Sequence, residues 1–239
     1  MKDIILLPTY NERENVRIII PEIFADYPKI HIMVVDDSSP DGTAEEVEKL
    51  MPKYPNLSIL KRKGKEGLGK AYVDAMQRVR EDEEIRSIIT MDADGSHGVE
   101  YLKDFLREIN DYDLVIGSRY VKNGGVENWE FWRRNLSRFG NIYAKILTGL
   151  PINDFTAGFM CIRREFIEKM DFDKISASGY SFMMEIKFNL IKVLGARVKE
   201  VPIIFKRRRE GESKISGHII KEGLKIPWLL FFKRVWKKK

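Results

Sequence analysis

The sequence of 239 residues predicts an α/β fold, a mostly parallel, Rossmann-like sheet flanked by helices. Over roughly the first 95 residues, apolar segments of strand length alternate four times with segments of helical spacing, which is typical of a parallel sheet covered by helices. Several of these strands end in polar turns with carboxylates. In open α/β sheets, ligands bind beyond the carboxyl ends of the strands, so we expect a ligand site at that edge.

The first half of the chain supplies the regular part of this pattern. We expect strands over residues 3–7, 30–35, 57–61 and 85–91, with helices after the first two strands that run to about residues 24 and 51. Pro8 should stop the first strand. A basic loop with Gly64, Gly67 and Gly69 opens a third helix. It matches neither a Walker A loop nor G-x-G-x-x-G, so a loop beside a nucleotide and a plain strand-to-helix turn both remain open.

The second half is less regular. We expect strands over residues 114–117, 159–162 and 198–205, a helix over 132–147 that carries several arginines, and an amphipathic helix over 180–194. Pro202 within the last strand favours an edge position or a bulge. We see no repeats and no low-complexity linker, which indicates one catalytic domain.

Composition narrows the class of protein. A chain that is 44% hydrophobic and 33% charged can build one substantial core. The single cysteine, Cys161, excludes a disulfide framework within the chain and fits a reducing compartment. We expect no secretory signal, because only four consecutive apolar residues precede Pro8, and no transmembrane helix, because no apolar run approaches roughly 18 residues.

Asp92 and Asp94 follow the fourth expected strand and are two residues apart. Side chains at i and i+2 of an extended chain point to the same face, and two carboxylates that close repel each other unless a cation lies between them. Mg²⁺ or Mn²⁺ prefers oxygen ligands of this kind and shares them with phosphates. The pair therefore indicates a metal-diphosphate site, with an acidic turn that caps the next helix as the alternative. The earlier strand ends would hold a nucleoside, with Asp37 accepting hydrogen bonds from base or ribose.

Four basic residues would be more positive charge than a single diphosphate requires for binding: Arg119, Arg133, Arg208 and Lys214. Arginine forks suit phosphate oxygens, so a second anionic substrate is expected. A phosphate acceptor is already ionised at neutral pH and needs positioning more than a general base. For each arginine alone, a solvated surface charge remains the alternative.

The C-terminal segment 219–239 mixes aromatic and aliphatic residues with lysines, in a chain of net charge +6. This mixture is typical of a helix in the headgroup region of a membrane. A helix packed on the core, or one docked on a membrane-spanning partner, are the alternatives. We therefore divide the chain into a catalytic domain, residues 1–215, and an amphipathic basic helix, residues 216–239.

Seven motifs in order resemble one enzyme family: Pro8-Thr9-Tyr10-Asn11-Glu12, residues 34–43 (VVDDSSPDGT), Asp92-Ala93-Asp94, Gly117-Ser118-Arg119-Tyr120, Asp154-x-Thr156-x-Gly158-Phe159, Glu200-Val201-Pro202-Ile203 and Gly211-Glu212-Ser213-Lys214. Together they resemble the family 2 inverting glycosyltransferases, and among them the dolichyl- or polyprenyl-phosphate mannosyltransferases. The resemblance covers residues 3 to 215. It implies a GT-A fold and a hexosyltransferase that moves mannose from GDP-mannose to a polyprenyl phosphate, with inversion to a β-linked product.

The resemblance also implies residue roles. The nucleotide would contact Pro8, Tyr10, Glu12, Val35, Asp37 and Ala93, and Mg²⁺ or Mn²⁺ would be held by Asp92, Asp94 and Ser96. Arg119 and Arg133 would meet the acceptor phosphate, and Arg208 and Lys214 would close over the site from a mobile loop. Asp92, Asp94, Arg119 and Arg133 would be the catalytic set.

Two departures from the family pattern matter. Ser96 stands where some members have a longer glutamine, so its contact with the metal would run through water. Many members carry transmembrane helices after the catalytic domain, whereas one amphipathic segment follows here. Attachment to the cytoplasmic face of a membrane would then fall to that segment or to a small membrane-spanning subunit.

Two alternatives stay open at this point. A UDP-glucose or UDP-GlcNAc transferase acting on polyprenyl phosphate would keep the fold and the metal site. A non-catalytic nucleotide- or RNA-binding protein would use the basic tail, would not need Asp92 and Asp94, and would bind in a strongly salt-dependent way. Stacked-aromatic RNA motifs are missing, so no nucleic-acid partner is expected.

Overall fold

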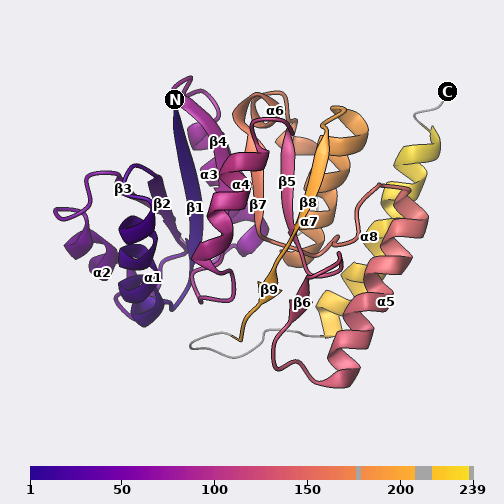
Figure 1. Ribbon diagram of the computed structural model, residues 1–239, viewed down its shortest axis with the longest axis horizontal. Coiled ribbons are helices and arrows are strands. Elements are labelled where there is room, and N and C mark those ends of the chain that lie inside the picture. Colours follow the sequence, from indigo (N-terminus) through magenta and orange to yellow (C-terminus); the bar gives the residue numbers. More distant parts are fainter. Residues whose placement is uncertain (176–178, 208–216, 237–239) are drawn as a thin grey trace.

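A seven-stranded sheet in the order β3-β2-β1-β4-β7-β5-β8 forms the centre of the molecule (Figure 1). The computed structural model describes residues 1–175, 179–207 and 217–236. The strands of the sheet are β1 (Lys2–Thr9), β2 (His31–Asp36), β3 (Leu57–Lys61), β4 (Ile85–Thr90), β5 (Leu114–Ser118), β7 (Met160–Arg163) and β8 (Val198–Pro202). All neighbouring pairs are parallel except those of β7, which runs antiparallel to both β4 and β5. The mostly parallel sheet expected from the sequence is confirmed.

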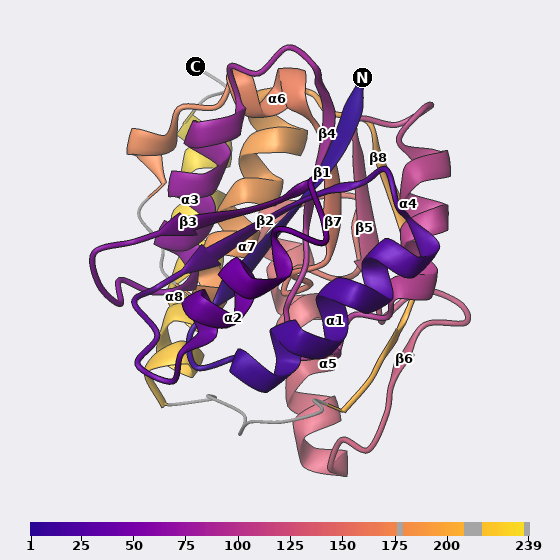
Figure 2. The same ribbon diagram turned by 90° about the vertical axis from the view of Figure 1, so that its left-hand side faces the viewer.

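Helices cover both faces of the sheet (Figure 2). One apolar cluster joins a face of the sheet to α1 (Arg13–Asp26), α2 (Thr43–Leu50) and α4 (Leu102–Glu108). A second cluster joins the other face to α3 (Leu68–Val79), α5 (Phe131–Thr148), α6 (Arg164–Glu168), α7 (Gly179–Phe188) and α8 (Gly217–Trp236). Alternate residues of one strand enter different clusters, as Ile4 and Leu6 do against Ile5 and Leu7, because side chains alternate across a strand. Short helical turns complete the layers: η1 (Val99–Tyr101), η2 (Phe172–Lys174) and η3 (Asn189–Val193).

Prolines occur near the ends of two strands. The prediction that Pro8 stops the first strand is wrong, since β1 continues to Thr9 and Pro8 pairs with Val35 of β2. Pairing of β1 with β4 ends at Leu6, so the chain around Pro8 is paired on one side only and tolerates the missing N–H. Pro202 ends β8, an edge strand, as expected. The expected single strand over 198–205 is divided, because the chain leaves the main sheet after Pro202 and β9 (Ile204–Phe205) pairs instead with β6 (Gly125–Val126).

Helix α7 is not amphipathic, contrary to expectation. Every residue from Ser181 to Phe188 is buried, Glu185 and Lys187 included. The helix lies between the sheet, α3 and α8, which leaves it no solvent face. The expected helix over 180–194 ends its α-helical part at Phe188 and continues as the π-turn η3.

The C-terminal helix α8 packs along α5 and α7 (Figure 1). Ile226 and Leu230 are buried in the core, and the hydroxyl of Tyr143 on α5 donates to the carbonyl of Leu224 at 3.0 Å. The opposite side of α8 exposes Trp228 and Phe232, which are 47% and 50% exposed. In the part of the chain that the structure describes, no helix has the length and apolar character needed to cross a membrane.

Candidate active site

The turns after β1 and β2 meet at the carboxyl edge of the sheet. Asp36, the last residue of β2, accepts hydrogen bonds from the hydroxyl of Thr9 at 3.1 Å and from the backbone N–H and hydroxyl of Ser39 at 3.0 and 2.5 Å. The backbone N–H of Asp37 donates to the carbonyl of Thr9 at 3.1 Å. Asp36 therefore fixes the turn, and its neighbour Asp37 is held at the edge of the sheet.

The carboxylate of Asp37 joins this edge to the glycine loop. It forms an ion pair with Arg62 and accepts the backbone N–H of Gly67 at 3.2 Å. Lys65 of the same loop lies over the ring of Tyr10, with Nζ 3.8 Å from the ring centroid. The loop thus folds toward the two turns that the sequence associates with a nucleotide.

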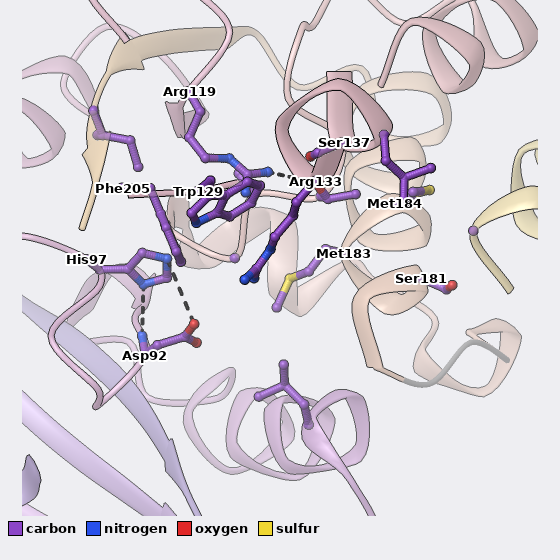
Figure 3. A pocket seen from close by; sticks show the side chains of 17 residues that line it. Asp92, His97, Arg119, Trp129, Arg133, Ser137, Ser181, Met183, Met184 and Phe205 are labelled. Atoms are coloured by element: carbon purple, nitrogen blue, oxygen red, sulfur yellow. Dashed lines mark hydrogen bonds and ion pairs between the residues drawn. The ribbon is translucent and has the colours of Figure 1, made fainter. Parts of the chain in front are cut away.

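Asp92 lies two residues after the end of β4, and its backbone is held by a buried histidine. The N–H of Asp92 donates to Nδ1 of His97 at 2.9 Å, which makes Nδ1 an acceptor and leaves the ring proton on Nε2. Nε2 lies 4.0 Å from a carboxylate oxygen of Asp92 (Figure 3). The imidazole stacks on Phe159 and meets the edge of Phe205. This packing fixes the direction in which Asp92 leaves the strand.

Asp94 and Ser96 are buried residues of the same turn. Asp94 is 4% exposed and accepts the backbone N–H of Ser96 at 3.0 Å. The hydroxyl of Ser96 is buried and has no hydrogen-bond partner among the described residues, and the same holds for the hydroxyl of Tyr72 on α3. Burial and the charges of Asp92 and Asp94 raise the pKa of Tyr72 well above its ordinary value. Two carboxylates with two unsatisfied hydroxyl oxygens are a set of hard oxygen donors, which fits a hydrated Mg²⁺ or Mn²⁺.

The described side chains alone do not complete a metal shell here. Among the described residues, no group of three or more His, Cys, Asp and Glu side chains is placed to hold a metal. Mg²⁺ usually takes one or two carboxylates and completes its shell with water and substrate phosphates. The two aspartates match that pattern.

The guanidinium of Arg119 is held in place by the buried carboxylate of Asp154. Its Nε and Nη2 donate to the two oxygens of Asp154 at 2.7 Å each, and Nη2 also donates to the hydroxyl of Thr156 at 2.7 Å. Asp154 is fully buried, which raises its pKa, but the charge and hydrogen bonds of Arg119 outweigh burial and lower the pKa below the usual value. The pair therefore remains ionised and fixes the guanidinium at the site.

Two further charged residues shape the loop that carries Asp154. Nζ of the buried Lys187 lies within hydrogen-bond distance of the carbonyls of Asp154, Phe155 and Ala157, at 3.0, 2.9 and 2.7 Å. Glu200, in the Glu-Val-Pro-Ile motif, accepts the backbone N–H of Asp154 at 3.0 Å. These bonds place the loop, and through it Arg119.

A cavity of about 180 Å³ brings these parts together. Figure 3 shows Asp92 and His97 on one side, and Arg119, Trp129 and Arg133 on the other. Cζ of Arg133 lies 4.3 Å from the ring centroid of Trp129. Much of the remaining wall is apolar, formed by Leu68, Leu136, Ala157, Met183, Met184, Ile203 and Phe205. A carboxylate from the Asp-x-Asp turn therefore faces two guanidiniums across a largely apolar chamber.

The structure places the predicted residues in three groups. Asp92, Arg119 and Arg133 line the cavity, and Asp94, Ala93 and Ser96 are buried in the adjoining turn. Pro8, Tyr10, Glu12, Val35 and Asp37 lie at or beside the carboxyl ends of β1 and β2. Arg208 and Lys214 lie outside the described residues.

Several lining residues were not predicted from the sequence. His97 and Trp129 are the main ones, and Met183, Met184 and Phe205 form apolar wall. The only signals were local: His97 closes the Asp-x-Asp turn, and Trp129 precedes Arg133 by four residues.

Comparison with known proteins agrees with this geometry. Residues 4–171 match the model of glycosyl transferase family 2. The α/β sheet and the Asp-x-Asp turn at its carboxyl edge agree with a glycosyltransferase. The chain belongs to glycosyltransferase family 2, and the expected hexosyltransferase class is confirmed.

Three curated relatives cover most of the chain. A polyprenol monophosphomannose synthase of Mycolicibacterium smegmatis is 40% identical over 93% of this chain and 84% of its own length. An undecaprenyl-phosphate mannosyltransferase of Micrococcus luteus is 38% identical over 94% of this chain and 91% of its own. A dolichol-phosphate mannosyltransferase of Pyrococcus furiosus is 37% identical over 94% of this chain, which spans 62% of that longer protein.

Solved structures confirm the GT-A fold. A glucosyl-3-phosphoglycerate synthase from Mycobacterium tuberculosis, crystallised with Mn²⁺, UDP and phosphoglyceric acid, gives a TM-score of 0.69 at 13% identity, over 98% of this chain and 78% of the other. A mannosyltransferase from Pyrobaculum calidifontis, in complex with GDP-Man and Mn²⁺, gives 0.60 at 17% identity, over 99% of this chain and 64% of the other.

Proposed function

We propose that this protein transfers mannose from GDP-mannose to a polyprenyl phosphate such as dolichyl phosphate, with inversion, and releases GDP. The observation that carries the proposal is the cavity in which Asp92 faces Arg119 and Arg133. One side is suited to a leaving diphosphate and the other to an incoming phosphate. The names of the three relatives support mannose and a lipid phosphate, and the GDP-Man complex of the archaeal mannosyltransferase supports the donor.

The reaction needs one bond made and one broken at the anomeric carbon of mannose. A phosphate oxygen of the acceptor attacks that carbon from the face opposite the diphosphate, the bond from the carbon to the diphosphate oxygen breaks, and GDP carries away the electron pair. The acceptor is already ionised, so no general base is required. Arg119 and Arg133 orient the acceptor, and their charge keeps it in an attacking position.

At the donor side, Pro8, Tyr10, Glu12, Val35, Asp37 and Ala93 would bind the nucleotide, and Asp92, Asp94 and Ser96 would hold Mg²⁺ or Mn²⁺. A divalent ion supplies charge stabilisation to the departing diphosphate. Asp92 and Asp94 provide the fixed negative charge that retains the ion, and His97 fixes the backbone of Asp92. Arg208 and Lys214 stay predicted contacts of the diphosphate and the acceptor.

The acceptor is a lipid, so we further propose that residues 1–215 act as the catalytic domain at the cytoplasmic face of a membrane, with residues 216–239 docked on that membrane. Exposed apolar side chains on both α5 and α8 support this: Phe131, Trp132, Leu136, Phe139, Ile142, Ile146, Leu224, Trp228, Leu229, Phe232 and Val235. Because α5 and α8 pack together, we infer that these side chains form one apolar face. A small membrane-spanning subunit on that face is the alternative attachment.

The test measures transfer of radiolabelled sugar from GDP-mannose, UDP-glucose and UDP-GlcNAc, separately, to a short polyprenyl phosphate in detergent. We expect labelling from GDP-mannose that requires Mg²⁺ or Mn²⁺, stops with EDTA and is absent in Asp94→Ala. Labelling only from a UDP-sugar would overturn the donor while keeping the reaction class. Labelling that persists in EDTA would overturn the metal site.

A further inference from the structure

A second cleft lies on another face of α5. Its volume is about 700 Å³, and it is formed by the loop over residues 119–126 and by α5. Arg119 contributes to this cleft and to the cavity of the active site. The two hollows are therefore neighbours with α5 between them, and the proposed mechanism uses only one of them.

The second cleft is basic. Arg134, Arg138 and Lys145 line it, at spacings of four and seven residues that place them on one stripe of the helix. No carboxylate occurs among the described residues that line the cleft. Among the described residues, neither Arg134 nor Arg138 has an ion-pair partner. Within the described part of the chain, Lys145 donates only to the neutral side chain of Asn153, at 2.7 Å. Three cations without a counter-charge among the described residues favour binding of an anion, and two arginine forks suit a phosphate group.

The apolar stripe of α5 borders this cleft. Phe131, Phe139 and Ile146 are each about 70% exposed, at 71%, 70% and 72%. Phe131 also lines the cleft itself. At a bilayer surface, apolar side chains enter the acyl region while arginine and lysine remain at the level of the headgroups. On α5 the basic stripe and the apolar stripe lie side by side, as expected for a helix at the boundary between headgroups and acyl chains.

We propose that this cleft binds the phosphate of an anionic phospholipid headgroup, so that α5 takes one fixed rotation on the bilayer. The inference extends the proposed membrane docking but does not depend on mannosyl transfer, because it concerns binding without donor or acceptor. It has a consequence for the active site. With Arg119 shared by both hollows, the headgroup phosphates and the acceptor phosphate lie at a similar depth, and the acceptor reaches Arg119 and Arg133 without leaving the surface.

The test is cosedimentation of the full chain with phosphatidylcholine vesicles and with vesicles that contain about one-fifth phosphatidylglycerol. We expect clearly tighter binding to the anionic vesicles. Arg134→Gln/Arg138→Gln should reduce that binding about tenfold or more and leave binding to neutral vesicles unchanged, because each basic residue near an anionic surface contributes substantially. The matched control is Lys29→Gln/Arg78→Gln, which removes the same charge from exposed positions away from α5.

A second variant tests the cleft without removing a cation. Asn135→Asp adds a carboxylate inside the cleft and keeps every cation, so it should weaken binding to anionic vesicles while far-ultraviolet circular dichroism stays unchanged. Equal binding by Arg134→Gln/Arg138→Gln and by the control variant would overturn the proposal. Release of the protein by inorganic phosphate, at an ionic strength where NaCl releases none, would show a site for free phosphate and would also overturn it.

Discussion

The guanidinium of Arg133 lies over the indole ring of Trp129, with Cζ 4.3 Å from the ring centroid. Cζ of Arg119 lies 5.5 Å from the same ring. The indole is therefore shared by two cations that both line the active-site cavity. A guanidinium on an indole face gains about 0.5–2 kcal/mol. Trp129 should thus hold Arg133 toward the acceptor and offset the repulsion between the two charges.

Trp129→Leu should raise KM for the lipid phosphate roughly five- to twentyfold, which matches a loss of about 1–2 kcal/mol. GDP affinity should change little, because the ring lies on the acceptor side of the cavity. The measurements are steady-state transfer in detergent and calorimetric GDP binding. The control is Trp132→Leu, an exposed neighbour at 57% that does not line the cavity. Equal effects of both variants would contradict the role of Trp129.

Asp94→Ala and Arg133→Ala should fail in different ways. Asp94→Ala removes a carboxylate from the metal turn, so transfer should fall by about a thousandfold or more and metal-dependent GDP binding should be lost. Arg133→Ala should keep GDP binding within about twofold and raise KM for the lipid phosphate. Separate titrations with GDP and with polyprenyl phosphate check both. If Arg133→Ala instead destroyed GDP binding and left lipid use intact, the acceptor assignment would be wrong.

The carboxyl edge of the sheet was predictable because its signals are local. Apolar runs and the polar turns behind them lie within a few residues of each other, and the alternation of strands and helices brings those turns to one edge. Asp37, Asp92 and Asp94 follow β2 and β4 as the pattern required. The pairing of Arg119 with Asp154 was harder to predict from the sequence, because the two residues are 35 positions apart. They meet only because β5 and the loop before β7 lie side by side in the fold.

Burial of polar groups was not predictable from the sequence. The spacing of apolar residues in α7 resembles a surface helix, and only its position between the sheet, α3 and α8 buries Lys187. In the sequence, nothing distinguishes Tyr72 from an ordinary core residue. Its closeness to Asp92 and Asp94 depends on the packing of α3 against the sheet. Tertiary contacts of this kind have no local signal.

Tyr72→Phe should leave the free protein as stable or make it slightly more stable. The hydroxyl is fully buried and no described residue forms a hydrogen bond with it, and such a group costs about 1–3 kcal/mol. Its neighbours Asp92 and Asp94 are the proposed metal ligands, so the same change should reduce the rise in Tm that Mg²⁺ and GDP produce together. Thermal melts with and without Mg²⁺ and GDP measure both effects.

Tyr143→Phe is the matched control for Tyr72→Phe. The hydroxyl of Tyr143 donates to the carbonyl of Leu224 at 3.0 Å, so its loss should lower Tm without altering the ligand-induced rise. A drop in Tm for Tyr72→Phe as large as that for Tyr143→Phe would show that the Tyr72 hydroxyl is hydrogen-bonded in the folded protein.

Lys187 should give stability a distinct dependence on pH. Burial lowers its pKa from 10.5 to about 7, although the charge of Asp154 acts in the opposite direction. Between these values the unfolded chain binds a proton that the folded chain has released, so the free energy of unfolding rises with pH by at most about 1.4 kcal/mol per unit. The gain starts near pH 7 and is complete near pH 10.5.

Lys187→Met should remove this gain and also the donor to three backbone carbonyls, so the variant should be less stable at every pH. Urea midpoints of wild type and variant, measured at intervals from neutral pH to about pH 9.5, should diverge as pH rises. Lys192→Met, at an exposed position a short distance along the chain, should stay parallel to wild type. A constant difference between wild type and Lys187→Met would mean that the Lys187 ammonium stays protonated across this range, held by Asp154 and the carbonyls around it.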